Sequence, residues 1–303
     1  MIKNDDENEI LGQGVSATGL AVNYIKYQAK NPNFWQQYPA HGKPTREKPL
    51  FKDEFMPLFI TSKAEELANQ LFDPKLRLAI AVRHRFFTRV MAASIKQDKD
   101  AVKQVVILGS GCDTHAVRKE KYSQKFGVKF FEIDLPAVLD AKEKIYKKNH
   151  INKNAVFIGM DYTQEDWIQA LKNNRLDFSL PTHFIWEGNT MYIPKEKINS
   201  MLHQIKNNFL GKVILSFDYL SEKTVRQITS SAESNKMVDN LRAIKAPIVT
   251  GYTDIAKELA EQFDFIVTDN SKCAELTKKY GAGDAPYVSQ ENYYLCTMTN
   301  KRS

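Results

Sequence analysis

Short apolar runs alternate with helical patterns between residues 104 and 217. This alternation is typical of a parallel sheet with helices on both faces, because each crossover returns the chain to the same edge. The carboxyl ends of the strands then share one edge, where a ligand is expected. The pattern predicts parallel strands at Gln104–Leu108, Lys129–Ile133, Ala155–Gly159, Thr182–Trp186 and Lys212–Phe217, with helices at about Pro136–Lys148, Gln164–Asn173 and Lys195–Asn208.

The first 95 residues show helical spacing on both sides of a proline-rich segment. We expect helices at Ser16–Lys30, Ala64–Leu71 and Leu76–Ile95, after a frayed tail of about 14 residues. Prolines at positions 32, 39, 44, 49 and 57 exclude long regular elements, so this segment is expected to wrap the surface. We therefore divide the chain into an N-terminal helical and proline-rich lid region, 1–95, packed on a core domain, 96–303.

After Tyr219 a polar, helical insert at about residues 220–250 interrupts the alternation of strands and helices. This insert is a candidate for part of a lid. A helix at Thr253–Gln262 and strands at Phe265–Thr268 and Tyr293–Met298 are expected after it. The glycine-rich segment Tyr280–Gly283 separates these two strands.

The composition is that of a folded globular protein, with 43% hydrophobic and 26% charged residues. Three scattered cysteines, Cys112, Cys273 and Cys296, argue against a disulfide framework or metal cluster and indicate a reducing compartment. Residues 1–10 are polar and acidic, unlike a signal peptide, and no apolar run approaches the ~18 residues that span a bilayer. We expect a cytoplasmic protein with no membrane partner, and a monomer is compatible with the sequence.

The net charge of +7 suggests either nucleic acid or an acidic substrate. Nucleic acid is disfavoured because no aromatic-and-basic signature accompanies the lysines. Runs such as Lys142–Lys148 are better explained as the solvated face of a helix.

A glycine loop follows the first predicted strand, and an acid ends the second. Gly109-Ser110-Gly111 allows backbone to approach a ligand, and Asp134, 23 positions after Gly111, is placed to accept hydrogen bonds from ribose hydroxyls. Asp134 is also a candidate helix cap, because Pro136 starts a predicted helix. The dinucleotide fingerprint requires a third glycine where this chain has Thr114, which weakens a nicotinamide or flavin interpretation.

Several blocks in order resemble the leucine carboxyl methyltransferase family. The loop Leu108–Thr114 resembles its Leu-Gly-x-Gly-x-Asp-Thr motif, and Phe131–Pro136 resembles its Glu-x-Asp-x-Pro block. Trp186–Pro194 is similar to its Glu-Gly-x-x-x-Tyr-Leu block, and Ala81–Phe87 to the Arg-x-Arg-Phe-Phe upstream of the loop in bacterial members. Pro49–Asp53 resembles the N-terminal region of the family. The chain departs from the family pattern at Cys112 and Asn189 and in its proline-rich segment.

The resemblance implies a Rossmann-like class I methyltransferase fold, α/β, with a seven-stranded mostly parallel sheet whose last strand is antiparallel. It implies S-adenosyl-L-methionine as cofactor. Arg83 would bind the methionine carboxylate and Glu187 with Gly188 would lie by the amino group. Gly109, Ser110 and Gly111 would admit the cofactor, Asp134 with Leu135 would hold the ribose, and Asp161 with Tyr162 would border the adenine.

Simpler explanations exist for some of these residues. Asp161 is also compatible with a turn before a helix, and Tyr192 is a candidate for positioning the substrate or for plain packing. Cys112 is not expected to be a nucleophile, the tryptophans Trp167 and Trp186 are expected in the core, and the six histidines show no metal-ligand spacing in the sequence. We predict no metal and name no catalytic residue.

The expected reaction is O-methylation of a carboxylate on a small molecule or on a peptide or protein C-terminus. A carboxylate is ionised at neutral pH, so it requires no general base. Arg85, Arg89 and Arg118 are candidates for positioning an anionic acceptor, or are surface charges. An NAD-dependent oxidoreductase of the same fold and a non-catalytic protein that binds an adenosyl ligand are the alternatives.

Overall fold

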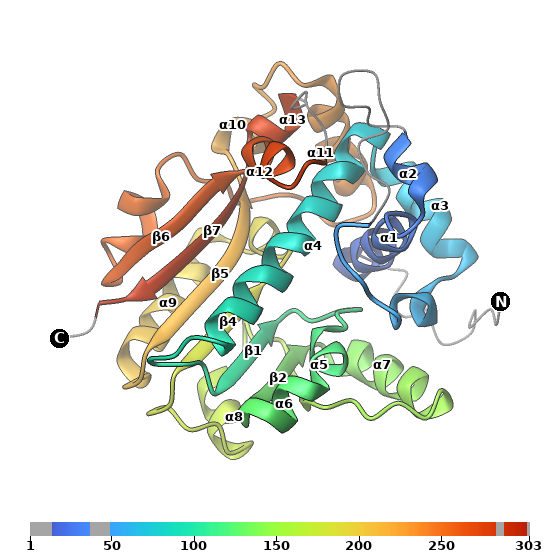
Figure 1. The fold of residues 1–303 in the computed structure, drawn as a ribbon. Coiled ribbons are helices and arrows are strands. Elements are labelled where there is room, and N and C mark those ends of the chain that lie inside the picture. Colours follow the sequence, from blue (N-terminus) through green and yellow to red (C-terminus); the bar gives the residue numbers. More distant parts are fainter. Residues whose placement is uncertain (1–13, 37–48, 283–287, 302–303) are drawn as a thin grey trace.

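A single seven-stranded sheet forms the centre of the molecule, with strand order β3-β2-β1-β4-β5-β7-β6 (Figure 1). This computed structural model describes residues 14–36, 49–282 and 288–301. Strands β1 to β5 pair in parallel, and β7 is antiparallel to both of its neighbours, as the sequence predicts. The strands are β1 (Gln104–Leu108), β2 (Lys129–Asp134), β3 (Val156–Gly159), β4 (Thr182–Trp186), β5 (Val213–Leu220), β6 (Phe265–Lys272) and β7 (Tyr293–Asn300).

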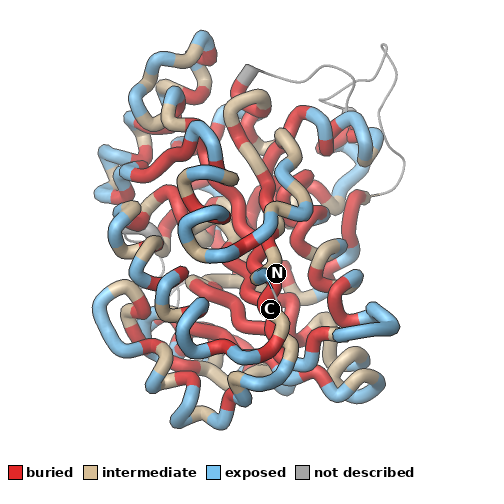
Figure 2. The backbone as a smooth tube through the Cα atoms, turned by 90° about the vertical axis from the view of Figure 1, so that its left-hand side faces the viewer, coloured by how far each residue is buried: buried red, intermediate tan, exposed pale blue. Residues whose placement is uncertain are grey.

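Helices cover both faces of this sheet, and Figure 2 shows the buried backbone concentrated between them. Val105 and Ile107 of β1 belong to the core shared with α1 and α4, whereas Val106 and Leu108 belong to the core shared with α8 and α9. The helices are α1 (Gly14–Gln28), α2 (Pro32–Gln36), α3 (Ser62–Leu71), α4 (Pro74–Ile95), α5 (His115–Arg118), α6 (Glu120–Phe126), α7 (Pro136–Lys148), α8 (Trp167–Asn173), α9 (Lys195–Asn208), α10 (Glu222–Val225), α11 (Ala232–Ala243), α12 (Cys273–Lys279) and α13 (Val288–Glu291), with the short turns η3 (Met56–Phe59), η4 (Thr190–Tyr192) and η5 (Ala256–Ala260).

The N-terminal helices gather on one side of the sheet, where α1 packs on α3 and α4 packs on β4 and β5 (Figure 1). Local sequence sets where two of them begin. The Thr61 side chain accepts a hydrogen bond from the Ala64 amide at 3.0 Å, and Asp73 accepts one from Lys75 before Pro74 opens α4. The three long helices predicted in this region are confirmed within about two residues at each end.

The proline-rich segment does not simply wrap the surface, which corrects the prediction. Leu50, Phe51, Asp53 and Met56 are buried. The Phe51 ring packs edge-on against the His84 ring, with 4.6 Å between centroids. Burial of this segment depends on partners far along the chain, which the local proline pattern does not reveal. The frayed tail and the prolines at 39 and 44 lie outside the described residues.

Three other expectations need correction. The predicted helix Thr253–Gln262 is only a π-helical turn, η5. Strands β5 and β6 extend beyond their predicted ends because β7 pairs with almost their whole length. Lys142 is not on a solvated face: it is 1% exposed and forms an ion pair with the buried Glu132.

The predicted insert is present as α10 and α11. None of the described helices is long and apolar enough to cross a membrane.

Candidate functional site

A cavity of about 270 Å³ lies at the carboxyl edge of β1, β2 and β4, and α1 forms part of its wall. The sequence predicted ten cofactor-binding residues and one positioning residue, and all of them line this one cavity. They are Arg83, Gly109, Ser110, Gly111, Asp134, Leu135, Asp161, Tyr162, Glu187, Gly188 and Tyr192. Residues from separate segments of the chain therefore meet where parallel strands end.

The glycine loop shapes one wall of the cavity. Gly109 and Gly111 have φ of +64° and +45°, which side chains other than glycine rarely adopt. A Cβ at Gly111 would meet no atom within 4 Å, whereas one at Gly109 would lie 1.5 Å from Nδ2 of Asn189. Gly109 therefore lets Asn189 pack on the loop.

Asp134 holds the glycine loop rather than capping a helix. Its carboxylate accepts hydrogen bonds from the amides of Gly111 and Leu135, each at 2.7 Å. Helix α7 has Leu135 at its N-cap position, with no capping side chain. Burial raises the pKa of Asp134 although both amides stabilise its charged form. Each carboxylate oxygen retains a lone pair for a ligand hydroxyl.

Beyond Asp134, Leu135, Met160 and Tyr162 make the cavity wall more apolar. Leu135 is 46% exposed, and the buried Tyr162 accepts a hydrogen bond from the indole of Trp186 at 3.2 Å. The Asp161 carboxylate accepts a hydrogen bond from the Thr163 amide at 3.0 Å, as in the turn interpretation, but it also lines the cavity. An apolar surface beside an acceptor suits a heteroaromatic base.

Arg83 and Glu187 form an ion pair in the wall of the cavity. Nε of Arg83 donates to Oε1 of Glu187 at 3.1 Å, and Nη1 donates to the hydroxyl of Tyr293 at 3.1 Å. Gly188 has φ of +73°, and a Cβ there would lie 3.0 Å from the guanidinium. The absence of a side chain at Gly188 therefore allows the backbone to pack flat against Arg83.

Lys26 is the functional candidate that sequence reasoning missed. It comes from α1, and its Nζ lies 2.8 Å from Oε1 of Glu187 in the cavity wall. Burial would raise the pKa of Glu187, but Lys26 and Arg83 lower it well below its ordinary value. The only local signal was a lysine among the apolar residues of the predicted helix.

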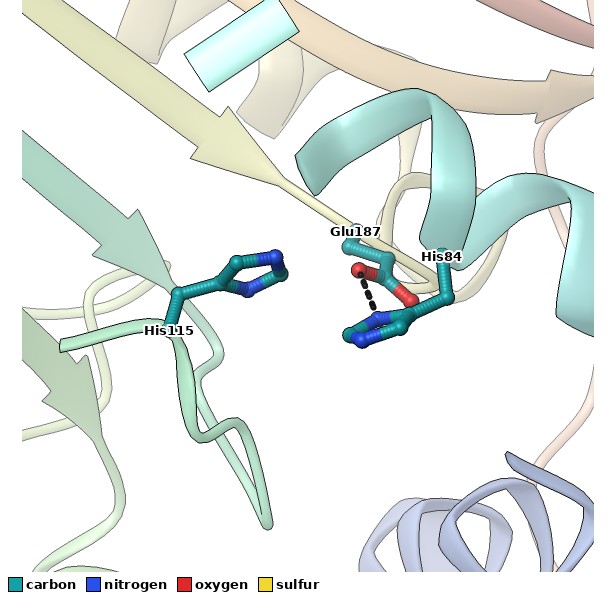
Figure 3. Close-up of side chains that lie close together, drawn as sticks. All are labelled: His84, His115 and Glu187. Atoms are coloured by element: carbon teal, nitrogen blue, oxygen red, sulfur yellow. Dashed lines mark ion pairs between the residues drawn. The ribbon is translucent and has the colours of Figure 1, made fainter. Parts of the chain in front are cut away.

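Two buried histidines lie behind this wall, close to Glu187 (Figure 3). Nδ1 of His84 is 3.7 Å from Oε2 of Glu187, and Nε2 of His84 accepts from Arg118 at 3.1 Å. His115 contacts Asp113 at 2.6 Å and Thr88 at 2.9 Å. Burial lowers the pKa of both histidines, so both are neutral at pH 7.

One ligand atom each from His84, His115 and Glu187 lies within 4.8 Å of the others, a proximity that sequence spacing did not show. Both nitrogens of His115 already have hydrogen-bond partners, and Lys26, Arg83 and Arg118 surround the group. A metal cation would meet three positive charges here. The arrangement fits a network of hydrogen bonds and ion pairs better than a metal site.

The three arginines named as possible anchors for an acceptor do not line the cavity. Arg118 is buried against Asp53, with 3.1 Å between Nε and Oδ2. Arg85 and Arg89 are exposed.

Trp167 and Trp186 are in the core, as predicted. Cys112 lines the cavity, but burial raises the pKa of its thiol to about 12, so it is a poor nucleophile at pH 7.

Solved structures share this architecture. One is a duf574 family protein from Streptomyces avermitilis, with a TM-score of 0.61 and 12% identity over 80% of this chain and 92% of that one. Another, described as a "putative methyltransferase" from Thermobifida fusca, has a TM-score of 0.56 and 16% identity over 80% and 89% of the two chains. The sheet order is that of the Rossmann-like class I methyltransferases.

Sequence relatives agree with the fold. A protein from Mycolicibacterium vanbaalenii is 29% identical over 68% of this chain and 67% of its own length, and one from Streptomyces coelicolor is 28% identical over 53% and 58%. Both are named "putative S-adenosyl-L-methionine-dependent methyltransferase". The second match covers less than two thirds of that relative.

Fold, cavity and relatives together define the class of this protein as S-adenosylmethionine-dependent methyltransferase. A model of one family within that class, leucine carboxyl methyltransferase, matches residues 39–206. The chain belongs to this family.

Proposed function

We propose that this chain transfers a methyl group from S-adenosylmethionine to a carboxylate oxygen. The observation that carries the proposal is the convergence of the predicted cofactor residues on one cavity. They come from α4, from the end of β2, and from the loops that follow β1, β2, β3 and β4. An NAD-dependent reaction is not favoured, because the position of the third glycine is Thr114, which donates to the buried Asp53 instead.

The donors and acceptors of the cavity fit each part of the cofactor. Arg83 is assigned to its carboxylate, since Nη2 makes no hydrogen bond to any described residue. Glu187, whose Oε2 has no hydrogen-bond partner in the described chain, is assigned to the ammonium group. Asp134 is assigned to the ribose hydroxyls. Leu135, Asp161 and Tyr162 are assigned to the adenine.

When bound, the cofactor supplies an electrophilic methyl group on a positively charged sulfur. The chain then has to hold an acceptor oxygen in line with that group and keep water out. No histidine lines the cavity among the described residues, and Glu187 is held ionised by two cations. Burial raises the pKa of Tyr192 to about 12, so its hydroxyl can donate to an acceptor but cannot remove a proton. A carboxylate needs no base, which supports it as the acceptor.

We further propose that the N-terminal region, within residues 1–95, acts as the lid of this site. Helix α1 contributes Thr18, Asn23 and Lys26 to the cavity wall. Movement of α1 away from the sheet would open the cavity, and its return would bring Lys26 to Glu187 and exclude water.

Calorimetric titration of the full chain with S-adenosylmethionine, S-adenosylhomocysteine and NAD tests the cofactor assignment. We expect the two adenosyl ligands to bind and NAD not to bind. Arg83→Ala and Asp134→Ala should each weaken binding by roughly 10-fold to 100-fold, because each removes charged hydrogen bonds worth about 1.5–3 kcal/mol.

Matched controls lie close by in the chain. Arg85→Ala changes an exposed arginine two positions from Arg83, and Asp140→Ala changes an exposed aspartate on α7. Both should bind the cofactor like the unaltered chain. The assignment would be contradicted if Arg83→Ala and Asp134→Ala bound S-adenosylmethionine as tightly as the unaltered chain does, or if NAD bound more tightly than S-adenosylmethionine.

A further inference from the structure

A second, smaller cavity of about 70 Å³ opens beside the methionine end of the first. The two cavities share Thr18, Val22, Arg83, Gly188 and Tyr192 in their walls. We call the second one the side chamber. It lies between α4, α11 and the ends of β5 and β7, where Leu76, Ile80, Met237, Leu241 and Ile248 make it apolar.

The side chamber has polar groups at its junction with the first cavity, and the hydroxyl-bearing Ser234, Ser289 and Tyr293 elsewhere in its walls. Arg83 and Tyr192 lie at the junction, and the Tyr192 hydroxyl can donate to an anion there. Ser289 lines the side chamber, is 6% exposed, and its hydroxyl has no hydrogen-bond partner among the described residues.

We infer that the side chamber holds the apolar body of the methyl acceptor, and that the acceptor is a short-chain aliphatic monocarboxylic acid. This inference rests on the proposed function. The carboxylate would lie at the junction, near Arg83 and Tyr192, which places an acceptor oxygen at the methionine end of the cofactor cavity. Its negative charge would also balance the positive sulfur of the cofactor.

The size of the side chamber decides between an aliphatic and an aromatic body. A cavity of about 150 Å³ accommodates benzene, and one water takes up about 30 Å³ in the liquid. At about 70 Å³, the side chamber is roughly half the size of that benzene-binding cavity. A chain of a few carbon atoms fits this space, and a benzene ring does not.

The polarity of the walls decides between a free acid and a peptide terminus. The last residue of a peptide carries an amide next to its side chain, and its N–H and C=O would enter the same apolar walls. An amide buried without partners costs about 1–3 kcal/mol or more. Leu76, Ile80, Met237 and Leu241 offer no side-chain hydrogen bonds there. A buried amide could turn only to the hydroxyls of Ser234 and Ser289, since that of Tyr293 is already bonded to Arg83 and Asp218.

The test uses the full chain with S-adenosylmethionine and follows S-adenosylhomocysteine release with butyrate, valerate, benzoate and a peptide with a free C-terminus. We expect kcat/KM to be at least 10-fold higher for butyrate or valerate than for benzoate or the peptide. Ala79→Leu fills the side chamber and should lower kcat/KM for valerate at least 10-fold, with cofactor affinity changed less than twofold. Met237→Ala enlarges it and should bring benzoate within threefold of valerate.

Ile228→Ala is the matched control, because Ile228 lies in the same insert but is 66% exposed. It should leave every acceptor unchanged. Cofactor binding without methylation of butyrate or valerate, preference for the peptide, or unaltered selectivity in both side-chamber variants would overturn this inference and leave the cofactor assignment standing. Failure of S-adenosylmethionine to bind would instead overturn the proposed function and this inference with it.

Discussion

Glu187 is buried with its charge compensated on several sides. Lys26 and Arg83 both contact Oε1, and Nδ1 of His84 faces Oε2. Taking a carboxylate out of water costs several kcal/mol unless such partners are present. A chain that needed only stability could use an apolar side chain here. The retained charge at the cavity wall therefore supports a binding role for Glu187.

At the same scale, the buried histidines predict how stability depends on pH. His183 lies between the hydroxyls of Ser94 and Ser216, at 2.8 Å and 2.9 Å, and burial lowers its pKa to about 3. An unfolded histidine has a pKa near 6.5, so between these values only the unfolded state binds the proton. The free energy of unfolding should therefore fall as the pH falls below 6.5, by about 1.4 kcal/mol per pH unit for each such histidine.

Substitution of His183 isolates its contribution to this pH dependence of stability. His183→Gln should reduce the slope of unfolding free energy against pH by roughly 1 kcal/mol per unit between pH 6 and pH 4. Urea unfolding at several pH values measures it. His203→Gln changes an exposed histidine of α9 and should leave the slope unaltered. An identical slope for His183→Gln would show that this residue is not buried in its neutral form.

At the scale of the element, α11 supplies one wall of the side chamber and depends on a local cap. The buried Ser231 side chain accepts a hydrogen bond from the Ser234 amide at 3.1 Å. Ser231→Ala should destabilise the first turn of α11 by about 1 kcal/mol. Amide hydrogen exchange should accelerate about fivefold in α11 and stay unchanged in β1.

Thr61→Ala removes the equivalent cap of α3 and is the control. It should accelerate exchange in α3 and leave α11 as it is. If Ser231→Ala accelerates exchange across the sheet as well, the insert folds together with the core rather than opening by itself.

At the scale of the whole molecule, the N-terminal region joins the core through apolar packing and buried charges. Asp53 contacts Arg118, and Lys26 reaches Glu187. Lys26→Met should lower the free energy of unfolding by about 3 kcal/mol, because it removes one partner of a buried ion pair. We place the cost at the low end of the usual range because Arg83 still pairs with Glu187. The substitution should also weaken cofactor binding at least 10-fold, measured by calorimetry beside urea unfolding.

Lys63→Met is the matched control, because the side chain of Lys63 is 50% exposed and its partner Glu66 is more exposed still. Its effect on stability should stay within about 0.5 kcal/mol. If Lys26→Met bound the cofactor with unchanged affinity, α1 would cover the site without taking part in it.

The fold and much of the candidate site were predictable from local signals. Buried strands, a glycine loop and an acid at the end of a strand each leave a short pattern, and strands β1 and β4 have their predicted bounds. The burial of Phe51 and Lys142 was not predictable, because it depends on how separate elements pack: Phe51 meets His84 of α4, and Lys142 of α7 meets Glu132 of β2. Lys26 escaped prediction for the same reason.

The sequence by itself determined the order of strands and helices, the family and the cofactor class. These follow from periodicity and from short motifs, which report on local backbone and on contacts within a few residues. Only the tertiary structure decided that α1 carries Lys26 to Glu187, that His84 and His115 lie together, and that α11 forms a chamber beside the cofactor cavity. Such contacts join residues a hundred or more positions apart, or depend on how whole helices pack, and no local pattern encodes them.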